Sequence, residues 1–179
     1  MDEYYIEGGF PVKGTVKASG NKNAALPCIA AAVLTDQPVT LKNLPEIEDV
    51  SVMFEIFKSF GGTIVKLAQN EYTLQLKTVT GYEVPVTLAQ KIRASILFAG
   101  PLLARHGKVM MTPPGGDVIG RRRLDTHFLA LTELGAQVKI NGHFLFTANK
   151  LIGQDIFLDE ASVTATENAV MAAVTAEGE

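Results

Sequence analysis

The 179-residue sequence contains one cysteine, Cys28, and no tryptophan. A single thiol cannot form an internal disulfide, which argues against a disulfide-stabilised secreted domain. The longest apolar stretches, such as residues 96–104, are far shorter than the roughly 18 residues that span a bilayer. The acidic start, Met-Asp-Glu-Tyr-Tyr, lacks the apolar core of a signal peptide. These absences predict a cytoplasmic protein with no membrane partner.

Positive charge is also scarce. Sixteen lysines and arginines against 19 aspartates and glutamates give a net charge of −3. Nucleic-acid-binding domains are usually strongly basic, so no nucleic-acid partner is expected. The sequence has no metal-ligand spacing, Walker loop, Rossmann fingerprint or nucleophile elbow. We therefore expect neither a metal nor a cofactor.

One loop departs from ordinary globular composition. Residues 113–127 read Pro-Pro-Gly-Gly-Asp-Val-Ile-Gly-Arg-Arg-Arg-Leu-Asp-Thr-His. The prolines and glycines exclude a regular helix or central strand through residues 113–120. Asp117 lies within this loop, and three arginines follow at 121–123. A basic cluster in an acidic background favours a small anionic ligand, and the nearby acid could move a proton.

The order helix, strand, helix, strand, strand occurs twice, which predicts an α/β (α+β) fold with an internal repeat. The first unit has helices over 23–34 and from Pro45, with strands at 39–41, 63–67 and 72–76. The second has helices over 91–104, irregular at Gly100-Pro101, and over 123–134, with strands at 109–111, 137–140 and 144–147. Each second helix has an apolar face, and the two faces are 74 residues apart: Val50, Phe54, Phe57 and Phe60, then Leu124, Phe128, Leu131 and Leu134.

Several local patterns refine this outline. Residues 1–21 carry a strand signal, and Cys28 on the first helix is expected to be packed. Asn141-Gly142 favours a type I′ hairpin turn. A third unit begins at Ser162 with a helix whose expected apolar face is Ala169, Ala172, Ala173 and Val174. No later element of this unit follows, so the chain is expected to be part of a longer protein.

Three helix starts align under the repeat: Lys22-Asn23, Arg93-Ala94-Ser95 and Ser162-Val163-Thr164. If the units pack around a pseudo-symmetry axis, these N-termini converge and attract an anion through free N–H groups and the helix dipole.

Each of these residues also has a plainer interpretation. Lys22 could simply be solvated, and Arg93 could pair with an acid. The arginines at 121–123 could be an exposed charge run, and Asp125 an ordinary acid at a helix start. His127, one helical turn beyond Arg123, is a weak candidate for the site.

Four separate motifs carry a family resemblance. They are Ser-Gly-Asn-Lys-Asn-Ala-Ala-Leu-Pro (19–27), Leu-Pro-Glu-Ile-Glu-Asp-Val (44–50), Arg-Ala-Ser (93–95) with Gly100-Pro101, and Pro-Gly-Gly-Asp-Val-Ile-Gly (114–120) with Asp125 and His127. In this order they closely resemble the UDP-N-acetylglucosamine 1-carboxyvinyltransferase family of enolpyruvyl transferases. The 5-enolpyruvylshikimate-3-phosphate synthases share the architecture but lack the Pro-Gly-Gly loop followed by Ile-Gly.

The resemblance implies an inside-out α/β barrel domain built from repeated βαβαββ units. The units would span about 21–85, about 86–155 and, truncated, 156–179, forming an incomplete first domain over 21–179. Residues 1–20 would pack with a second, C-terminal domain of the same protein, and the active site would lie between the two domains.

The resemblance also implies a reaction: transfer of the enolpyruvyl group of phosphoenolpyruvate to the 3′-hydroxyl of UDP-N-acetylglucosamine, with release of phosphate. Asp117 would be the general acid, and Lys22 and Asn23 would bind phosphoenolpyruvate. The residues expected to contact the UDP-sugar and phosphate are Arg93, Arg122, Arg123, Leu124, Asp125, Thr126, Ser162 and Val163. The alternatives are a shikimate-type transferase and a non-catalytic nucleotide-sugar-binding module.

Three positions depart from the family pattern. Asp117 stands where most members have cysteine, Glu160 where many have lysine, and Arg123 where proline is common. An aspartate with a pKa of about 3.9 is mostly ionised at neutral pH. Burial on closure of the loop would have to raise that pKa before Asp117 could donate a proton.

The missing sulfur predicts the response to fosfomycin, which inhibits this family by alkylating the loop cysteine. Asp117 is a carboxylate, a much poorer nucleophile toward an epoxide, so the full-length enzyme is expected to be insensitive. Intact-mass analysis after incubation with fosfomycin checks this, and a stoichiometric adduct on Asp117 would refute it.

Overall fold

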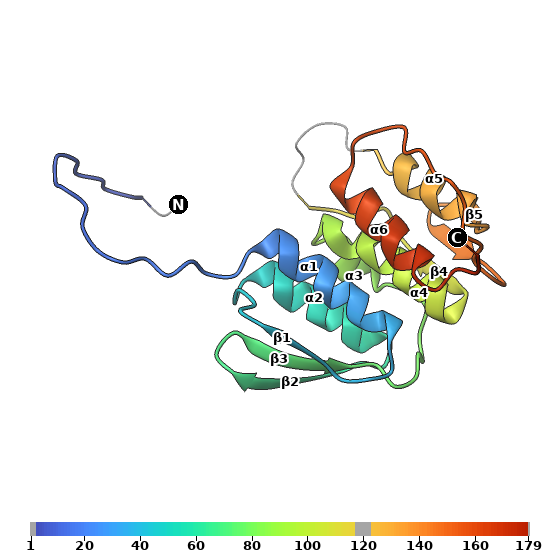
Figure 1. Cartoon of the computed structure of the whole chain (residues 1–179), viewed down its shortest axis with the longest axis horizontal. Coiled ribbons are helices and arrows are strands. Elements are labelled where there is room, and N and C mark those ends of the chain that lie inside the picture. Colours follow the sequence, from blue (N-terminus) through green and yellow to red (C-terminus); the bar gives the residue numbers. More distant parts are fainter. Residues whose placement is uncertain (1–2, 117–122, 179) are drawn as a thin grey trace.

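The computed structural model describes residues 3–116 and 123–178. Two antiparallel three-stranded sheets are each accompanied by helices (Figure 1). The first group comprises α1 (Lys22–Ala31), η1 (Ala32–Leu34), β1 (Val39–Lys42), α2 (Glu48–Ser59), β2 (Thr63–Ala68) and β3 (Glu71–Gln75). The second comprises α3 (Val86–Ala89), η2 (Arg93–Phe98), α4 (Ala99–His106), β4 (Lys108–Met111), α5 (Asp125–Glu133), β5 (Gln137–Ile140) and β6 (Phe144–Thr147), and α6 (Val163–Ala173) follows.

The two sheets have the same topology. Their strand orders are β1-β3-β2 and β4-β6-β5, so the last strand of each group lies in the centre. Thr40 pairs with Thr73 in the first sheet, and Met110 pairs with Leu145 in the second. The predicted mixed fold and its duplicated order of elements are confirmed. The residue boundaries assigned to the units stay a prediction.

The core forms where the predicted apolar faces meet. Val50, Phe54, Phe57 and Phe60 are all buried, as their spacing along α2 requires. Phe60 also contacts Phe98 of η2 edge to face, with ring centroids 5.3 Å apart, and so joins the two groups. Burying an aromatic side chain contributes roughly 2–3 kcal/mol, so this contact is a substantial part of the interface between them.

The N-terminal segment corrects one expectation. Residues 3–20 contain no strand and are largely exposed, and in Figure 1 the segment extends away from the body of the chain. A strand needs a partner for its backbone hydrogen bonds, and no described segment pairs with it. The predicted strand over residues 1–21 is therefore wrong for the described residues.

Two predicted helix boundaries also change. α2 begins at Glu48 rather than Pro45, because the Leu44 N–H bonds the Asn70 carbonyl at 2.9 Å and keeps this segment beside the β2–β3 turn. The expected helix over 91–104 divides into η2 and α4. Pro101 lies in the first turn of α4, where the missing N–H costs no helical hydrogen bond.

Three smaller expectations fail. The β5–β6 loop has three residues, with Ile140 paired to Phe144 and Gly142 at φ 69°, so it is not a two-residue type I′ turn. Cys28 is exposed rather than packed. The buried face of α6 is Ala165, Asn168, Met171 and Ala172, whereas Ala173 and Val174 of the expected face are exposed.

The packing of α6 on α4 depends on the absence of a side chain at Gly100. A Cβ there would lie 2.5 Å from the Asn168 carbonyl oxygen and 2.7 Å from Asn168 Oδ1. The Gly100 N–H also donates to that Oδ1 at 2.7 Å. Because Gly100 is in the first turn of α4, its N–H has no helical acceptor, and the buried amide supplies one.

This contact predicts that Gly100→Ala destabilises the protein. Alanine gains about 1 kcal/mol in helix propensity, but overpacking against a backbone carbonyl typically costs about 1–3 kcal/mol, and the N–H bond to Asn168 is strained as well. We expect a lower urea midpoint of unfolding. Gly8→Ala is the matched control, since a Cβ there meets nothing within 4 Å. Equal midpoints for the two variants would contradict the prediction.

Candidate functional site

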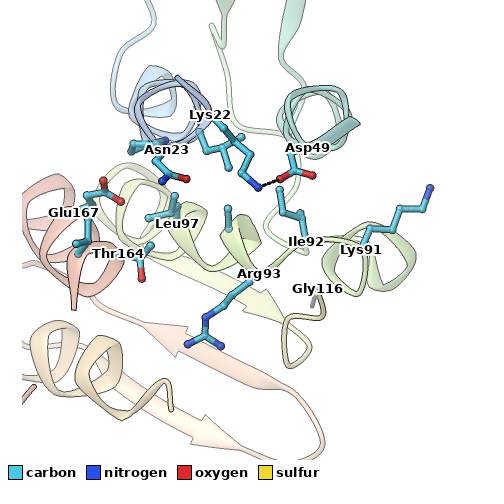
Figure 2. Close-up of a pocket in the computed structure, with 14 residues that line it drawn as sticks. Lys22, Asn23, Asp49, Lys91, Ile92, Arg93, Leu97, Gly116, Thr164 and Glu167 are labelled. Carbon is cyan, nitrogen blue, oxygen red and sulfur yellow. Dashed lines mark ion pairs between the residues drawn. The ribbon is translucent and has the colours of Figure 1, made fainter. Parts of the chain in front are cut away.

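A cavity of about 390 Å³ lies where α1, η2 and α6 meet (Figure 2). Residues from all three predicted helix starts line it, so the structure brings these starts together. The lining residues are Lys22, Asn23, Leu26, Pro27, Asp49, Lys91, Ile92, Arg93, Ala94, Leu97, Gly116, Val163, Thr164 and Glu167. The sequence reasoning missed Asp49 and Glu167.

Lys22 is not simply solvated. Its Nζ lies 2.8 Å from Asp49 Oδ2, and both side chains are partly exposed to the cavity. α1 begins at Lys22 because the Asn21 side chain caps it, accepting the Ala24 N–H at 3.2 Å. Asp49 is in the first turn of α2, where an acid is favoured by the helix dipole. A ligand anion at Lys22 therefore meets a cation that already has a carboxylate partner.

Arg93 extends from η2 away from the Lys22–Asp49 pair (Figure 2). Its guanidinium donates to the Arg123 carbonyl at 2.9 Å. This bond ties η2 to the segment that enters α5. The same arginine is thus at the wall of the cavity and next to the predicted UDP-sugar turn.

The first glycines of the glycine-rich loop lie close to the end of α3 and the start of η2. A Cβ on Gly115 would lie 1.7 Å from the Gln90 carbonyl oxygen, and Gly116 has φ +95° beside the Arg93 backbone. The Gly115 N–H also donates to the Ala89 carbonyl at 3.0 Å. Only glycine permits such an approach and such a φ without strain. The loop therefore enters and borders the cavity next to Arg93.

The predicted residues at the start of α5 form their own contacts and do not line the cavity. Arg123 donates to Asp125 at 2.6 Å, and this partner raises the pKa of the arginine. The buried Thr126 hydroxyl donates to Asp159 at 2.9 Å. Leu124 is the residue before the helix and is partly buried.

The start of α6, unlike that of α5, provides residues that line the cavity. The Ser162 hydroxyl accepts the Ala165 N–H at 3.3 Å and caps the helix. Val163 is 74% exposed and lines the cavity. Glu167, one turn further along, also lines it, and burial raises the pKa of its carboxyl group.

His127 belongs to a buried polar cluster that the sequence did not indicate. It is 1% exposed, its Nδ1 is 3.1 Å from Asn168 Nδ2, and its Nε2 is 3.3 Å from Thr164 Oγ1. Burial, with a smaller contribution from the charge of Arg93, lowers the pKa of His127 to about 4. The ring is therefore neutral at pH 7.

Asp117 and Arg122, the predicted general acid and the predicted phosphate ligand, lie outside the described residues. Within the described ranges, no group of three or more His, Cys, Asp or Glu side chains could hold a metal ion. No helix in those ranges is long and apolar enough to cross a bilayer.

The lowered pKa of His127 predicts a pH-dependent stability. In the unfolded chain the ring takes up a proton near its ordinary pKa of 6.5, whereas the folded protein takes it up only near 4. The free energy of unfolding should therefore fall by up to about 3 kcal/mol as the pH drops from 6.5 toward 4. His127→Gln has no titrating ring at this position, so its free energy of unfolding should not show this fall. Parallel pH profiles of the urea midpoint for the two proteins would contradict the assignment.

Comparison with known proteins adds a family match and close relatives. The family model described as EPSP synthase (3-phosphoshikimate 1-carboxyvinyltransferase) matches residues 6–179. A protein of Treponema denticola named UDP-N-acetylglucosamine 1-carboxyvinyltransferase is 67% identical over 99% of this chain and 42% of its own length. Relatives of the same name in Treponema pallidum and Bradyrhizobium diazoefficiens are 65% and 54% identical. The chain thus spans about two fifths of the length of these relatives.

Solved structures show the same fold. The enolpyruvyl transferase NikO from Streptomyces tendae superposes with a TM-score of 0.78 at 23% identity, covering 96% of this chain and 40% of that one. EPSP synthase from Acinetobacter baumannii gives 0.72 at 21% identity, over 92% and 39% of the two chains. The relatives of that name bear out the resemblance seen in the sequence. The family match shows that this chain belongs to the EPSP synthase (3-phosphoshikimate 1-carboxyvinyltransferase) family.

Proposed function

We propose that this chain is the N-terminal part of a UDP-N-acetylglucosamine 1-carboxyvinyltransferase, here called the full-length protein. The enzyme transfers the enolpyruvyl group of phosphoenolpyruvate to the 3′-hydroxyl of UDP-N-acetylglucosamine and releases phosphate, the first committed step of peptidoglycan synthesis. The observation that carries the proposal is the cavity itself, where the starts of α1, η2 and α6 meet with Lys22, Asn23 and Arg93 in its wall.

Phosphoenolpyruvate is assigned to the Lys22 end of the cavity. Lys22 and Asn23 open α1 and together offer a cation and an amide donor. A carboxylate or phosphate there would compete with Asp49, which holds Lys22 at 2.8 Å. Charge-assisted hydrogen bonds from such donors are roughly twice as strong as neutral ones, which supports binding of a multiply charged substrate.

The UDP-sugar is assigned to the opposite end. Arg93 reaches the Arg123 carbonyl, so it touches the described part of the predicted UDP-sugar segment, which begins at residue 123. Ser162 and Val163 at the start of α6 complete this end. Glu160 is exposed and bears the wrong charge to contact a diphosphate, so Arg93 and Arg122 carry the electrostatic attraction.

Asp117 is assigned as the general acid that protonates C3 of the enolpyruvyl group. The transfer needs a neutral carboxyl group, whereas free aspartate is mostly ionised at pH 7 and nearby arginines lower its pKa further. Closure of the cavity by a second domain would remove water and raise the pKa. The fraction of the relatives' length that this chain spans supports such a second domain, and the chain alone is expected to be inactive.

The sharpest test compares Asp117→Asn and Asp117→Cys in the full-length protein. Asparagine cannot donate the proton, so kcat should fall about 10²–10⁴-fold, with little change in substrate affinity. Cysteine restores an acid and a sulfur nucleophile, so activity should persist and become sensitive to fosfomycin. Phosphate release in the presence of both substrates measures each effect. Full activity of Asp117→Asn would overturn the role of the acid.

The substrate class is tested separately by calorimetry. The full-length protein should bind UDP-N-acetylglucosamine and not shikimate-3-phosphate. Binding of shikimate-3-phosphate alone would establish the shikimate-type alternative. Binding of the UDP-sugar without any turnover would establish the non-catalytic module.

A further inference from the structure

The buried amide of Asn168 has only one orientation compatible with its neighbours. Its Oδ1 accepts the Gly100 N–H at 2.7 Å, and its Nδ2 donates to the Ile96 carbonyl at 2.8 Å. A flipped amide would face an N–H with its own N–H₂ and a carbonyl with its own oxygen. Asn168 is completely buried, so neither mismatch could be relieved by water.

This orientation determines where the proton of His127 lies. The second Nδ2 hydrogen of Asn168 is directed at His127 Nδ1, 3.1 Å away, so Nδ1 acts as the acceptor and carries no proton. The ring is buried and neutral, and its one proton is therefore on Nε2. The tautomer of His127 is therefore determined by the Ile96 carbonyl and the Gly100 N–H, which fix the orientation of the Asn168 amide.

The Nε2–H is directed in turn at Thr164 Oγ1, 3.3 Å away. Thr164 accepts this hydrogen bond, so the proton of its own hydroxyl group is available for another acceptor. Within the described residues no second hydrogen bond to that hydroxyl is found, and Thr164 lines the cavity beside Glu167 (Figure 2). The chain of bonds thus ends in a donor at the cavity wall.

We propose that His127 is a positioning residue, which holds the Thr164 hydroxyl group as a hydrogen-bond donor to a phosphate oxygen of the ligand in this cavity. The inference deepens the proposed function and rests on it: the ligand group is the diphosphate of a nucleotide sugar. Thr164 is the second residue of α6, so free backbone N–H groups of the first turn accompany its hydroxyl. Arg93 supplies positive charge at the same end of the cavity.

Among the described residues of the cavity wall, Glu167 is the acidic group beside Thr164 (Figure 2). A carboxylate beside a diphosphate would weaken binding, and burial raises the pKa of the Glu167 carboxyl group in the direction that lessens this effect. His127 itself is almost completely buried and does not reach the ligand. In the proposal its effect on binding passes through Thr164, whereas a purely structural role would act through the contact with Asn168.

The test measures binding of inorganic pyrophosphate to the full-length protein by calorimetry. Thr164→Val keeps the shape of the side chain and removes the donor, so affinity should fall about tenfold, equivalent to about 1.4 kcal/mol. Thr164→Ser should recover most of this loss. Thr132→Val on the exposed face of α5 is the matched control, because the Thr132 hydroxyl donates to carbonyls of its own helix. This variant should bind pyrophosphate as the unchanged protein does.

His127 is tested through its coupling to Thr164. His127→Phe removes the Nε2–H donor and should weaken pyrophosphate binding to a similar extent, and adding Thr164→Val should cause no further loss. His127→Gln, which offers an amide N–H, should recover part of the affinity. Nitrogen-15 NMR of the His127 ring should show the proton on Nε2 in the absence of ligand.

Three results would overturn the proposal: unchanged pyrophosphate affinity of Thr164→Val, additive losses in the double variant, or a proton on Nδ1 of His127. Failure of the unchanged protein to bind pyrophosphate would overturn it too. The proposed substrate is tested by a different measurement, the binding of UDP-N-acetylglucosamine. If pyrophosphate binds with the expected losses and UDP-N-acetylglucosamine does not, the positioning role holds and the proposed substrate is wrong.

Discussion

The structure depends on one buried amide. Asn168 satisfies the free N–H of Gly100, the carbonyl of Ile96 and the Nδ1 of His127, and so connects α6 to η2, α4 and α5. Leaving such buried groups without partners costs about 1–3 kcal/mol each. An apolar residue of the same size would therefore not replace it. Because α6 lies against α4 at the distance that Gly100 allows, the amide also fixes where the start of α6 meets the cavity.

The repeat explains why the cavity lies where it does. Each group of elements brings a helix start to the same side of the chain, and close backbone approaches hold the parts in place. Gly115 packs on the Gln90 carbonyl with no room for a side chain. This places the base of the glycine-rich loop beside Arg93. The segment between Met111 and Asp125 of the second group is longer than the corresponding one between Lys42 and Glu48 of the first. The hydrophobic contact of Phe60 with Phe98 forms outside this longer connection.

The sequence predicted what depends on local periodicity. The β5 and β6 boundaries and the buried face of α2 follow from alternation and from 3.6-residue spacing. The same spacing rule gave the wrong buried face for the alanine-rich α6. Its buried face includes the polar Asn168, and Val174 at its end is exposed. At the site, alignment of the repeats brought Lys22 and Arg93 together. The contacts of Asp49 with Lys22 and of Thr164 with His127 could not be found this way, since each joins elements that only the folded chain places side by side.

Three described cations in or beside the site already have partners, and this limits which ligands can bind. Lys22 is paired with Asp49, Arg93 donates to the Arg123 carbonyl, and Arg123 is paired with Asp125. A ligand must exchange these interactions rather than add to them. Exposed ion pairs are worth only about 0–1 kcal/mol, so a phosphate with two charges gains from the exchange, whereas a singly charged acid gains little. The pairing therefore keeps separated cations from attracting simple carboxylates and favours phosphate groups.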